Sequence, residues 1–450
     1  MEKTLERLLK NTPILKGHME GHLGEILYGA AISLVLRVLG AGLAFLFNWI
    51  LARRCGADGA GLYYLALTVL TLGTVVGKLG LDNTLLRFIA AGAAVRNWAS
   101  VKGVYQKGMA LALLASGALS LVVFLAAGPI AEKVFHKPEL TGPLRWMALA
   151  IAPMSFLTLQ AEALKGLKRI KDSVLVTNVA LPALTCLGLV LWLKSEAQEA
   201  ALVYLLATVL TALLGYFLWR AATPRLVEVI PKFKNKHLIE SGRPLFITTV
   251  FETLTQWMSM FFLGIWATKA EVGVFGTALR VSMAVSVILS AVNSISAPKF
   301  AELYKKKKMK DLDHAARQSA RLMTLLAGPI LAVFLIFPGF IMGLFGPDFR
   351  SGAWLLAIMA IGQFVNVATG SVGYLLIMSG HEKLIQNRAV FIALLCLVLN
   401  LVLIPPFGTM GAAIATSLGV AATNLIAVYL VHEKLEIWTV PEIFRGSNNG

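Results

Sequence analysis

Charged residues are scarce in this chain, and the scarcity limits what the chain can be. Of the 450 residues, 14% are charged and 57% are hydrophobic, and the mean hydropathy is +0.74. A soluble globular domain carries roughly a quarter of its residues as charged side chains. The composition therefore excludes an ordinary soluble domain and indicates an all-α polytopic membrane protein.

Paired cysteines and nucleotide-binding motifs are also missing. The three cysteines, Cys55, Cys186 and Cys396, lack the paired spacing of a zinc or redox site. No Walker-type glycine loop, HExxH motif or hydrolase nucleophile motif occurs, and the seven histidines fall in predicted loops, tails or interfaces. We therefore expect no metal and no cofactor. Any transport would be driven by an H⁺ or Na⁺ gradient or by disposal of the substrate.

The sequence also lacks a large outer loop. A membrane glycan polymerase or transferase usually needs such a loop to carry its catalytic residues. The longest outer loop predicted here has about fifteen residues, from Gly128 to Gly142, with Glu132, His136 and Glu139 as its candidates. The sequence thus favours a chain that is not an enzyme, and a polymerase or transferase is the least favoured alternative.

Long apolar runs are what the sequence has instead. About twenty residues cross a hydrocarbon core of about 30 Å, and this rule predicts twelve transmembrane helices. Their predicted limits are 26–51, 59–80, 104–127, 143–164, 172–193, 199–219, 244–267, 271–297, 319–344, 352–379, 386–404 and 409–431.

Lysine and arginine indicate the orientation. With the N-terminus inside, the inner segments carry 30 of the 41 basic residues and the outer loops carry 8, while Arg37, Lys78 and Arg280 lie deeper within spans. Basic residues concentrate in cytoplasmic loops, so we expect both termini to be cytosolic. The net charge of +17 is then loop charge that faces anionic lipids, and no nucleic acid partner is expected.

A hydrophilic linker divides the spans six and six. We predict an interfacial amphipathic segment over 1–24, an N-lobe over 25–220, a cytosolic linker over 221–243, a C-lobe over 244–431 and a cytosolic tail over 432–450. The two six-helix lobes are expected to be pseudo-symmetric around a central cavity.

A short internal repeat supports the two lobes. Gly61-Leu62-Tyr63 and Ala66-Leu67 recur 212 residues later as Gly273-Val274-Phe275 and Ala278-Leu279. Both copies open the second span of their half from the same predicted side of the membrane. Parallel repeats of this kind are related by an axis along the membrane normal.

Arg37 lies near the middle of the first apolar span. The residues that share its helix face are small or polar, namely Ala30, Ser33, Gly40, Ala41, Ala44 and Asn48. An arginine at the bilayer centre costs several kcal/mol, so Arg37 should face protein or a watery cavity. In the other lobe, Arg280 of the eighth span is expected at a comparable depth.

Two acidic residues are candidates for ion coupling. Glu252 in the seventh span is either a protonation site or a partner of Arg37 or Arg280. Asp82 follows Lys78 at i,i+4, and this pair is either structural or part of a substrate site. Amides in the later spans are expected to bond between helices; they are Gln363, Asn366, Asn400 and Asn424.

The first ninety residues resemble a known family. The matching segments are Arg37-Val38-Leu39-Gly40, Ala52-Arg53, Gly56-Ala57, Gly61-Leu62-Tyr63, Gly80-Leu81-Asp82 and Arg87-Phe88-Ile89-Ala90. They are similar to the multidrug/oligosaccharidyl-lipid/polysaccharide exporter superfamily, in particular its polysaccharide-transporter branch, the Wzx-type flippases. The resemblance implies a monomeric flippase in the cytoplasmic (inner) membrane. It would move an undecaprenyl diphosphate-linked oligosaccharide by alternating access, for synthesis of an O-antigen-like surface polysaccharide.

Related lipid II flippases carry functional arginines on the first and eighth spans, which Arg37 and Arg280 match. This chain departs from them at Leu43, where a second arginine would stand, and in having twelve spans instead of fourteen.

The expected substrate site is cationic. Arginine can bind phosphate oxygens in a bidentate manner, so a diphosphate would suit it. The candidate binding residues in the cavity are Arg37, Arg280, Lys78, Arg87 and Asn48. A cation-coupled multidrug efflux transporter of the same superfamily is the alternative, although a drug cation would be opposed by Arg37.

Overall fold

A computed structural model of the chain describes residues 22–191, 196–223, 229–231 and 235–439. Every regular element in these ranges is a helix. The first half contains α2 (His22–Gly77), α3 (Leu81–Ala94), α4 (Trp98–Leu125), α5 (Ala127–Pro129), η1 (Ile130–Val134), η2 (Pro138–Leu140), α6 (Thr141–Gly166), α7 (Ile170–Val174), η3 (Leu175–Ala180), α8 (Leu181–Leu191) and α9 (Ala197–Ala222).

The second half has a similar succession of long helices. It contains α10 (Asn235–Trp266), α11 (Lys269–Ser282), η5 (Met283–Val285), α12 (Ser286–Lys305), α13 (Met309–Ile336), α14 (Pro338–Gly343), η6 (Pro347–Gly352), α15 (Ala353–Ala368), α16 (Val372–Met378) and α17 (Glu382–Leu435).

Each predicted span overlaps a helix of the structure. The described part of the chain has nine helical segments that are long and apolar enough to cross a membrane. Two of these segments, α2 and α17, contain a non-helical glycine, Gly56 or Gly408, and each therefore forms a hairpin of two spans. The seventh predicted span lies in α10. The prediction of an all-α polytopic membrane protein is confirmed.

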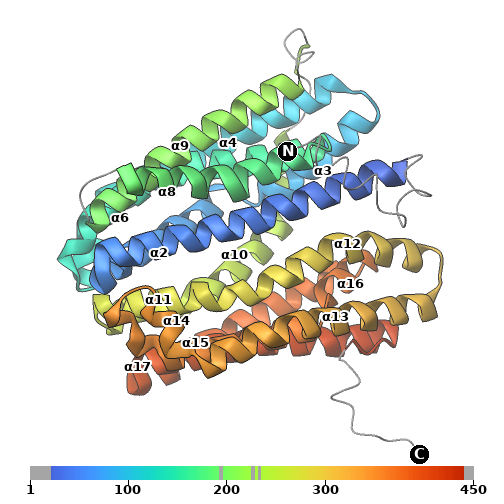
Figure 1. Cartoon of the computed structure of the whole chain (residues 1–450). Coiled ribbons are helices and arrows are strands. Elements are labelled where there is room, and N and C mark those ends of the chain that lie inside the picture. Colours follow the sequence, from blue (N-terminus) through green and yellow to red (C-terminus); the bar gives the residue numbers. More distant parts are fainter. Residues whose placement is uncertain (1–21, 192–195, 224–228, 232–234, 440–450) are drawn as a thin grey trace, which may run out of the picture.

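The helices form two groups that share a core at one end only (Figure 1). We call this the turn end, and it contains the α2 kink at Gly56, the start of α11 and η6. One cluster of buried side chains there includes residues of both groups, such as Tyr63 and Phe275. At the opposite, loop end, each group has a core of its own, around Leu85 in the first and Phe300 in the second. The groups are therefore joined at the turn end.

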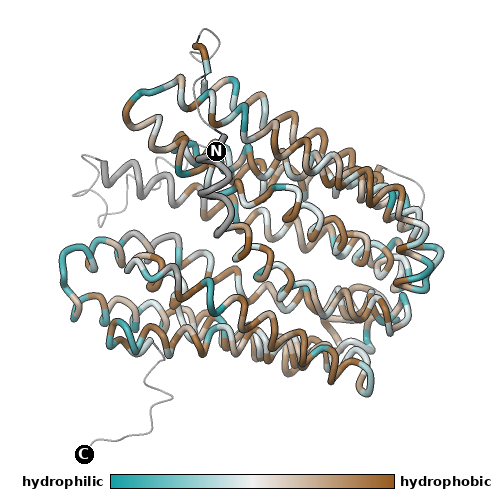
Figure 2. The backbone as a smooth tube through the Cα atoms, turned by 180° about the vertical axis from the view of Figure 1, so that it is seen from behind, coloured by the Kyte–Doolittle hydropathy of each residue, from teal (hydrophilic) through white to brown (hydrophobic). Residues whose placement is uncertain are grey.

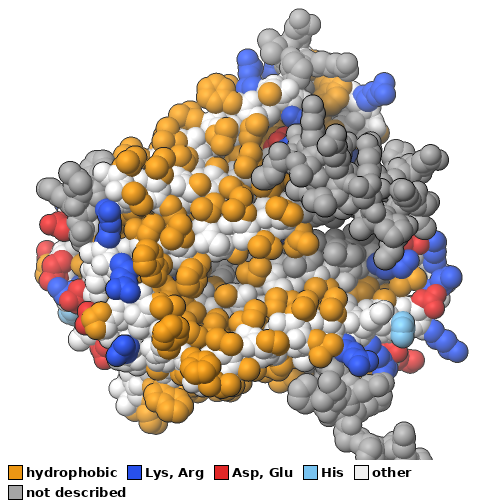
Figure 3. All heavy atoms as spheres, viewed as in Figure 1, with side chains coloured by type: hydrophobic (Ala, Val, Ile, Leu, Met, Phe, Trp, Pro, Cys, Tyr) orange, Lys and Arg blue, Asp and Glu red, His pale blue; other side chains and the backbone are white. Residues whose placement is uncertain are grey.

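Apolar side chains cover the outside of the molecule between its two ends. In Figure 2 the middle of the helices is hydrophobic and the connections are hydrophilic. In Figure 3 orange side chains form a broad band, while lysine, arginine and acidic side chains gather at the two ends. Exposed leucines of α4, α9 and α13 contribute to this apolar surface. Such a band matches the hydrocarbon layer of a membrane.

The two copies of the internal repeat meet at the turn end. A Cβ atom on Gly61 would overlap the carbonyl of Lys269, and one on Gly273 would overlap the carbonyl of Ala57. Because Ala57 and Lys269 are also 212 residues apart, the contact is the same in both directions. Backbones approach this closely only at small residues, which explains the glycine in each copy.

One predicted boundary differs from the structure. The linker was expected to extend over 221–243, but α10 already begins at Asn235, so the last part of that range is helical. The predicted amphipathic segment over 1–24 lies largely outside the described residues, since α2 begins at His22. Most of the predicted tail over 432–450 also lies outside them.

Candidate functional site

Arg280 of α11 lies between the two groups of helices. Its guanidinium carbon is 3.8 Å from the centre of the Tyr64 ring on α2 and 5.8 Å from that of Trp257 on α10. Its Nη1 atom donates a hydrogen bond to the carbonyl of Gly276 at 3.0 Å. Among the described residues no carboxylate pairs with it. Arg280 is thus held by an aromatic face and a carbonyl, which leave its positive charge without a counter-ion.

Arg37 is a half-buried residue of α2. Its Nε atom is buried and has no hydrogen-bond partner within the described part of the chain. Gly40, one turn further along, packs directly on the backbone of Asn178 in η3. The small face around Arg37 therefore allows α2 to approach η3 closely, while Val35 and Leu39 on the other side are exposed.

The two arginines do not share a depth. The Tyr64 hydroxyl, beside Arg280, donates a hydrogen bond to Asn48 Oδ1 at 3.0 Å. Asn48 lies eleven residues from Arg37 along α2, which corresponds to about 16 Å of helix. The expectation of comparable depth is wrong: Arg280 lies near the turn end and Arg37 lies closer to the loop end. The hairpin at Gly56 causes this, because it brings the second span back beside Asn48.

Asn48 and Arg87 occupy different surroundings. The Asn48 amide nitrogen donates to the carbonyl of Ala44 at 2.6 Å, and its Oδ1 accepts from Tyr64, so this side chain connects the part of α2 before Gly56 to the part after it, where Tyr64 lies against Arg280. Arg87 is exposed on α3, and its guanidinium carbon is 5.2 Å from the centre of the Phe88 ring. Asn48 is therefore close to Arg280, whereas Arg87 is at the loop end.

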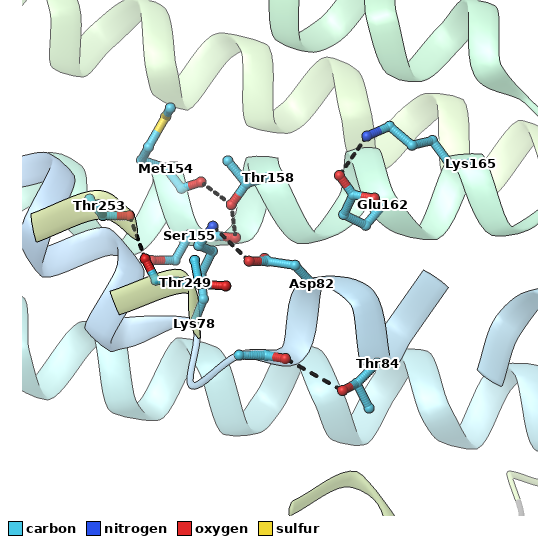
Figure 4. A network of polar contacts seen from close by, with 11 residues as sticks. Lys78, Asp82, Thr84, Met154, Ser155, Thr158, Glu162, Lys165, Thr249 and Thr253 are labelled. Atoms are coloured by element: carbon cyan, nitrogen blue, oxygen red, sulfur yellow. Dashed lines mark hydrogen bonds and ion pairs between the residues drawn. The ribbon is translucent and has the colours of Figure 1, made fainter. Parts of the chain in front are cut away.

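Lys78 and Asp82 form an ion pair across the break between α2 and α3. The Lys78 Nζ atom lies 3.0 Å from Asp82 Oδ2, and the two side chains are 11% and 18% exposed. Leu79 and Gly80 between them have positive φ angles of 54° and 69°. Figure 4 shows the two side chains pointing toward one another, drawn with Ser155 of α6 and Thr249 of α10. The charge of Lys78 is thus already matched by a carboxylate.

Glu252 projects from α10 as an exposed side chain. The basic residue that acts on it electrostatically is Arg388 of α17, whose Nη1 donates to the carbonyl of Thr423 at 3.4 Å. Arg280 is instead engaged by Tyr64. Among the described residues no ion pair joins Arg280 to Glu252, and the charge that acts on Glu252 comes from Arg388.

Several bonds close the turn end between the two groups. Trp49 and Arg53 of α2 both donate to the carbonyl of Leu344, at 3.0 and 2.8 Å. Lys269 pairs with Glu139 at 2.9 Å. The Lys137 ammonium donates to the carbonyl of Gly264 at 2.6 Å, and burial lowers the pKa of this ammonium. Together with the crossing of Gly61 and Gly273, these bonds hold the turn end shut.

Tyr64 is the residue of this candidate site that the sequence analysis did not single out. It is fully buried, and its ring lies against both Arg280 and the position of Gly276. Gly276 stands 212 residues after Tyr64, so the repeat itself placed these two residues opposite one another. The spacing of the repeat was the signal that could have found Tyr64.

Comparison with known families decides the assignment. Residues 26–304 match the family model Polysacc_synt, described as "Polysaccharide biosynthesis protein". The chain belongs to this polysaccharide biosynthesis protein family. A second model, MatE, matches residues 244–405. One relative of this chain is a protein of Haloferax volcanii named "Probable low-salt glycan biosynthesis flippase Agl15". It is 25% identical over 411 residues, which are 90% of this chain and 83% of the relative.

Solved structures of transporters share the fold of this chain. A multidrug resistance MATE family transporter in an inward-facing conformation has a TM-score of 0.74 and 14% identity, covering 90% of this chain and 98% of that one. The lipid II flippase MurJ in an inward closed conformation has a TM-score of 0.71 and 14% identity, covering 90% and 87%. Together with the family match, these likenesses confirm the resemblance to the exporter superfamily and show that the chain has the fold of these transporters.

Proposed function

We propose that the protein is a flippase that moves an isoprenoid diphosphate-linked oligosaccharide across the cytoplasmic membrane. The observation that carries the proposal is Arg280, a cation between the two groups of helices without a carboxylate partner in the described structure. An uncompensated arginine at membrane depth calls for an anion, and a diphosphate can accept its paired N–H groups. Arg37, with its unpartnered Nε, supplies a second cation closer to the loop end.

The separation of the two arginines suits a substrate that moves along a path. A diphosphate would meet Arg37 on entry from the loop end and Arg280 near the closed turn end. Separate cores at the loop end and a shared core at the turn end support alternating access from the loop side. The name of the Haloferax volcanii relative, a glycan biosynthesis flippase, supports a glycan as cargo.

The finer features of the proposal follow from the charge distribution and the family. The carrier lipid is undecaprenyl, and the product enters an O-antigen-like surface polysaccharide. The chain acts as a monomer with both termini cytosolic, and an H⁺ or Na⁺ gradient drives it, with Glu252 or Asp82 as the coupling carboxylate. Lys78 and Arg87 would contact the diphosphate near the loop end.

Single arginine substitutions test the proposal in cells. We expect Arg280→Gln and Arg37→Gln to abolish export of the surface glycan and to leave lipid-linked precursor inside, at unchanged expression. Arg145→Gln is the matched control, because Arg145 also lies over an aromatic ring, 5.8 Å from that of Phe124, but is exposed on α6. Full export by both test variants would refute the diphosphate site.

Two further measurements separate the alternatives. Protection of cells from cationic dyes on expression of the protein would favour multidrug efflux, and sugar transfer by the purified protein in detergent would favour an enzyme. We expect neither activity.

A further inference from the structure

The amides of the later spans meet in one chamber inside the second group of helices. The chamber has a volume of about 420 Å³ and is lined from α10, α11, α12, α15 and α17. Its polar lining consists mainly of amides and hydroxyls, from Gln256, Ser286, Gln363, Asn366, Asn400 and Asn424 among others. The sequence predicted bonds between helices for these amides. Gln363 and Asn366 of α15 do bond to Ser286 of α12, as predicted, whereas Asn400 and Asn424 donate within α17. The convergence of the amides on an open space further indicates a binding site, because polar groups inside a membrane lobe are costly without a partner.

Asn400 of α17 lines the chamber and leaves part of its hydrogen-bonding capacity unused among the described residues. Its amide nitrogen donates to the carbonyl of Cys396 at 2.7 Å. Its Oδ1 atom is buried and has no hydrogen-bond partner among the described residues, although the residue is only 1% exposed. A buried acceptor left unsatisfied costs about 1–3 kcal/mol, so a rotation of this amide that brought Oδ1 to a donor in the chamber would recover that energy.

The remaining lining defines the chemistry of the ligand. Ser286 and Asn366 both donate to Gln363 Oε1, at 2.5 and 3.3 Å, so a connected polar wall faces the space. Leu279 and Met283 supply an apolar side. A sugar ring has the matching character, with hydroxyls at its edge and C–H groups on its faces.

A bare metal ion fits the chamber less well. Glu252 is the one charged residue among the described lining residues. No group of three or more histidine, cysteine or acidic side chains that could hold a metal is found in the described ranges. A water molecule occupies about 30 Å³, so the space of about 420 Å³ would hold roughly fourteen of them, far more than one coordinated ion needs.

The chamber borders the Arg280 site on two helices. Leu279 of the chamber directly precedes Arg280 on α11, and Met283 of the chamber begins η5 three residues after Arg280. On α10, Gln256 of the chamber precedes Trp257, whose ring is 5.8 Å from the Arg280 guanidinium. A diphosphate on Arg280 would therefore have its attached sugar beside the chamber.

We propose that this chamber binds a neutral sugar of the lipid-linked glycan, the one attached to the diphosphate. The proposal rests on the proposed function. It assigns the amides of α15 and α17 to sugar recognition and Arg280 to the diphosphate, so that the two parts of one substrate are recognised by different helices.

Two probes with the same lipid diphosphate test the assignment. They are farnesyl diphosphate and the same lipid carrying one N-acetylglucosamine on the diphosphate, titrated into the purified full-length protein in lipid nanodiscs. We expect the wild type to bind the glycosylated probe about tenfold more tightly. Asn400→Leu and Asn366→Leu should remove this preference, whereas Arg280→Gln should weaken both probes equally.

Asn293→Leu is the matched control. Asn293 is also a buried amide of the second group of helices, with an unpartnered Oδ1 in the described structure, but it does not line the chamber. It should keep the tenfold preference. Ser286→Ala provides a milder chamber variant with the same expected loss of preference, should the leucine variants fail to fold.

The outcomes separate the two proposals. Equal wild-type affinity for the two probes overturns the sugar chamber and leaves lipid-diphosphate transport standing. Affinity for neither probe overturns both. Sodium binding that is lost in Asn400→Leu, with the sugar preference retained, overturns the sugar assignment in favour of a cation.

Discussion

Tyr64 holds Arg280 with its ring and holds Asn48 with its hydroxyl. The two interactions can be removed separately, because Tyr64→Phe keeps the ring and Tyr64→Leu removes it. A cation over an aromatic face gains about 0.5–2 kcal/mol, more when the pair is desolvated. We expect glycan export to stay near wild type in Tyr64→Phe and to fall several-fold in Tyr64→Leu, measured in cells at matched expression. Equal export by both variants would mean that the ring does not position Arg280.

The ion pair of Lys78 and Asp82 allows a second test on single residues. Asp82→Asn leaves the largely buried Lys78 ammonium without its carboxylate, and removal of one partner of a buried pair is strongly destabilising. We expect a lower midpoint of thermal unfolding in detergent for Asp82→Asn and a partial recovery when Lys78→Gln is added. If the double variant also regains export, the pair is structural; if stability returns without export, the pair contacts the substrate.

Individual residues were predicted unevenly by the sequence. Arg37 and the pairing of Lys78 with Asp82 follow from charge, helical spacing and the cost of burial, and the ion pair is in place. The sequence did not indicate which basic residue acts on Glu252. Arg388, the basic residue that acts on Glu252 electrostatically, lies 136 positions further along the chain on α17, which packs on α10.

At the scale of elements, the crossing of α2 and α11 is the closest approach between the two halves. Gly61→Ala or Gly273→Ala would place a Cβ against a carbonyl of the other helix. We expect either substitution to separate the helices at the turn end, to lower thermal stability in detergent and to slow export. Gly42→Ala on α2 is the control, since no atom lies within 4 Å of its added Cβ. Alanine favours a helix over glycine, so this control should be neutral or stabilising.

Helix boundaries were predicted well where apolar runs end at charged or glycine-rich turns, as at Gly56 and Leu125. The stretch from Asn235 to Arg243, which was predicted as part of a linker, is largely polar and yet helical. Hydropathy reports contact with lipid and not helicity, so a helix that continues beyond the membrane is invisible to it. The prediction that Arg37 and Arg280 lie at a comparable depth was wrong for a similar reason, because the depth of a residue depends on how the hairpins pack.

For the whole molecule, the closed turn end predicts that alternating access must break specific bonds between the two groups. Glu139 and Lys269 form one of these bonds, and both side chains are accessible. In a background with Cys55, Cys186 and Cys396 replaced by serine, we expect Glu139→Cys with Lys269→Cys to be joined by a short thiol cross-linker. Export should then stop. Each single cysteine variant, treated alike, should continue to export, and uninhibited export by the cross-linked protein would show that the turn end need not open.

The crossing of the two repeat copies has a consequence for how the chain can change. Ala57 faces Gly273 in the way that Lys269 faces Gly61. This reciprocity is the arrangement of an isologous dimer interface, in which one patch is complementary to itself. In a homodimer one mutation changes both patches at once. Here a single polypeptide carries both patches at different positions, so a mutation changes only one of them, and the changed patch must still fit the other. The two glycines therefore constrain each other as a pair, and a bulkier residue in one copy needs its compensation more than two hundred positions away.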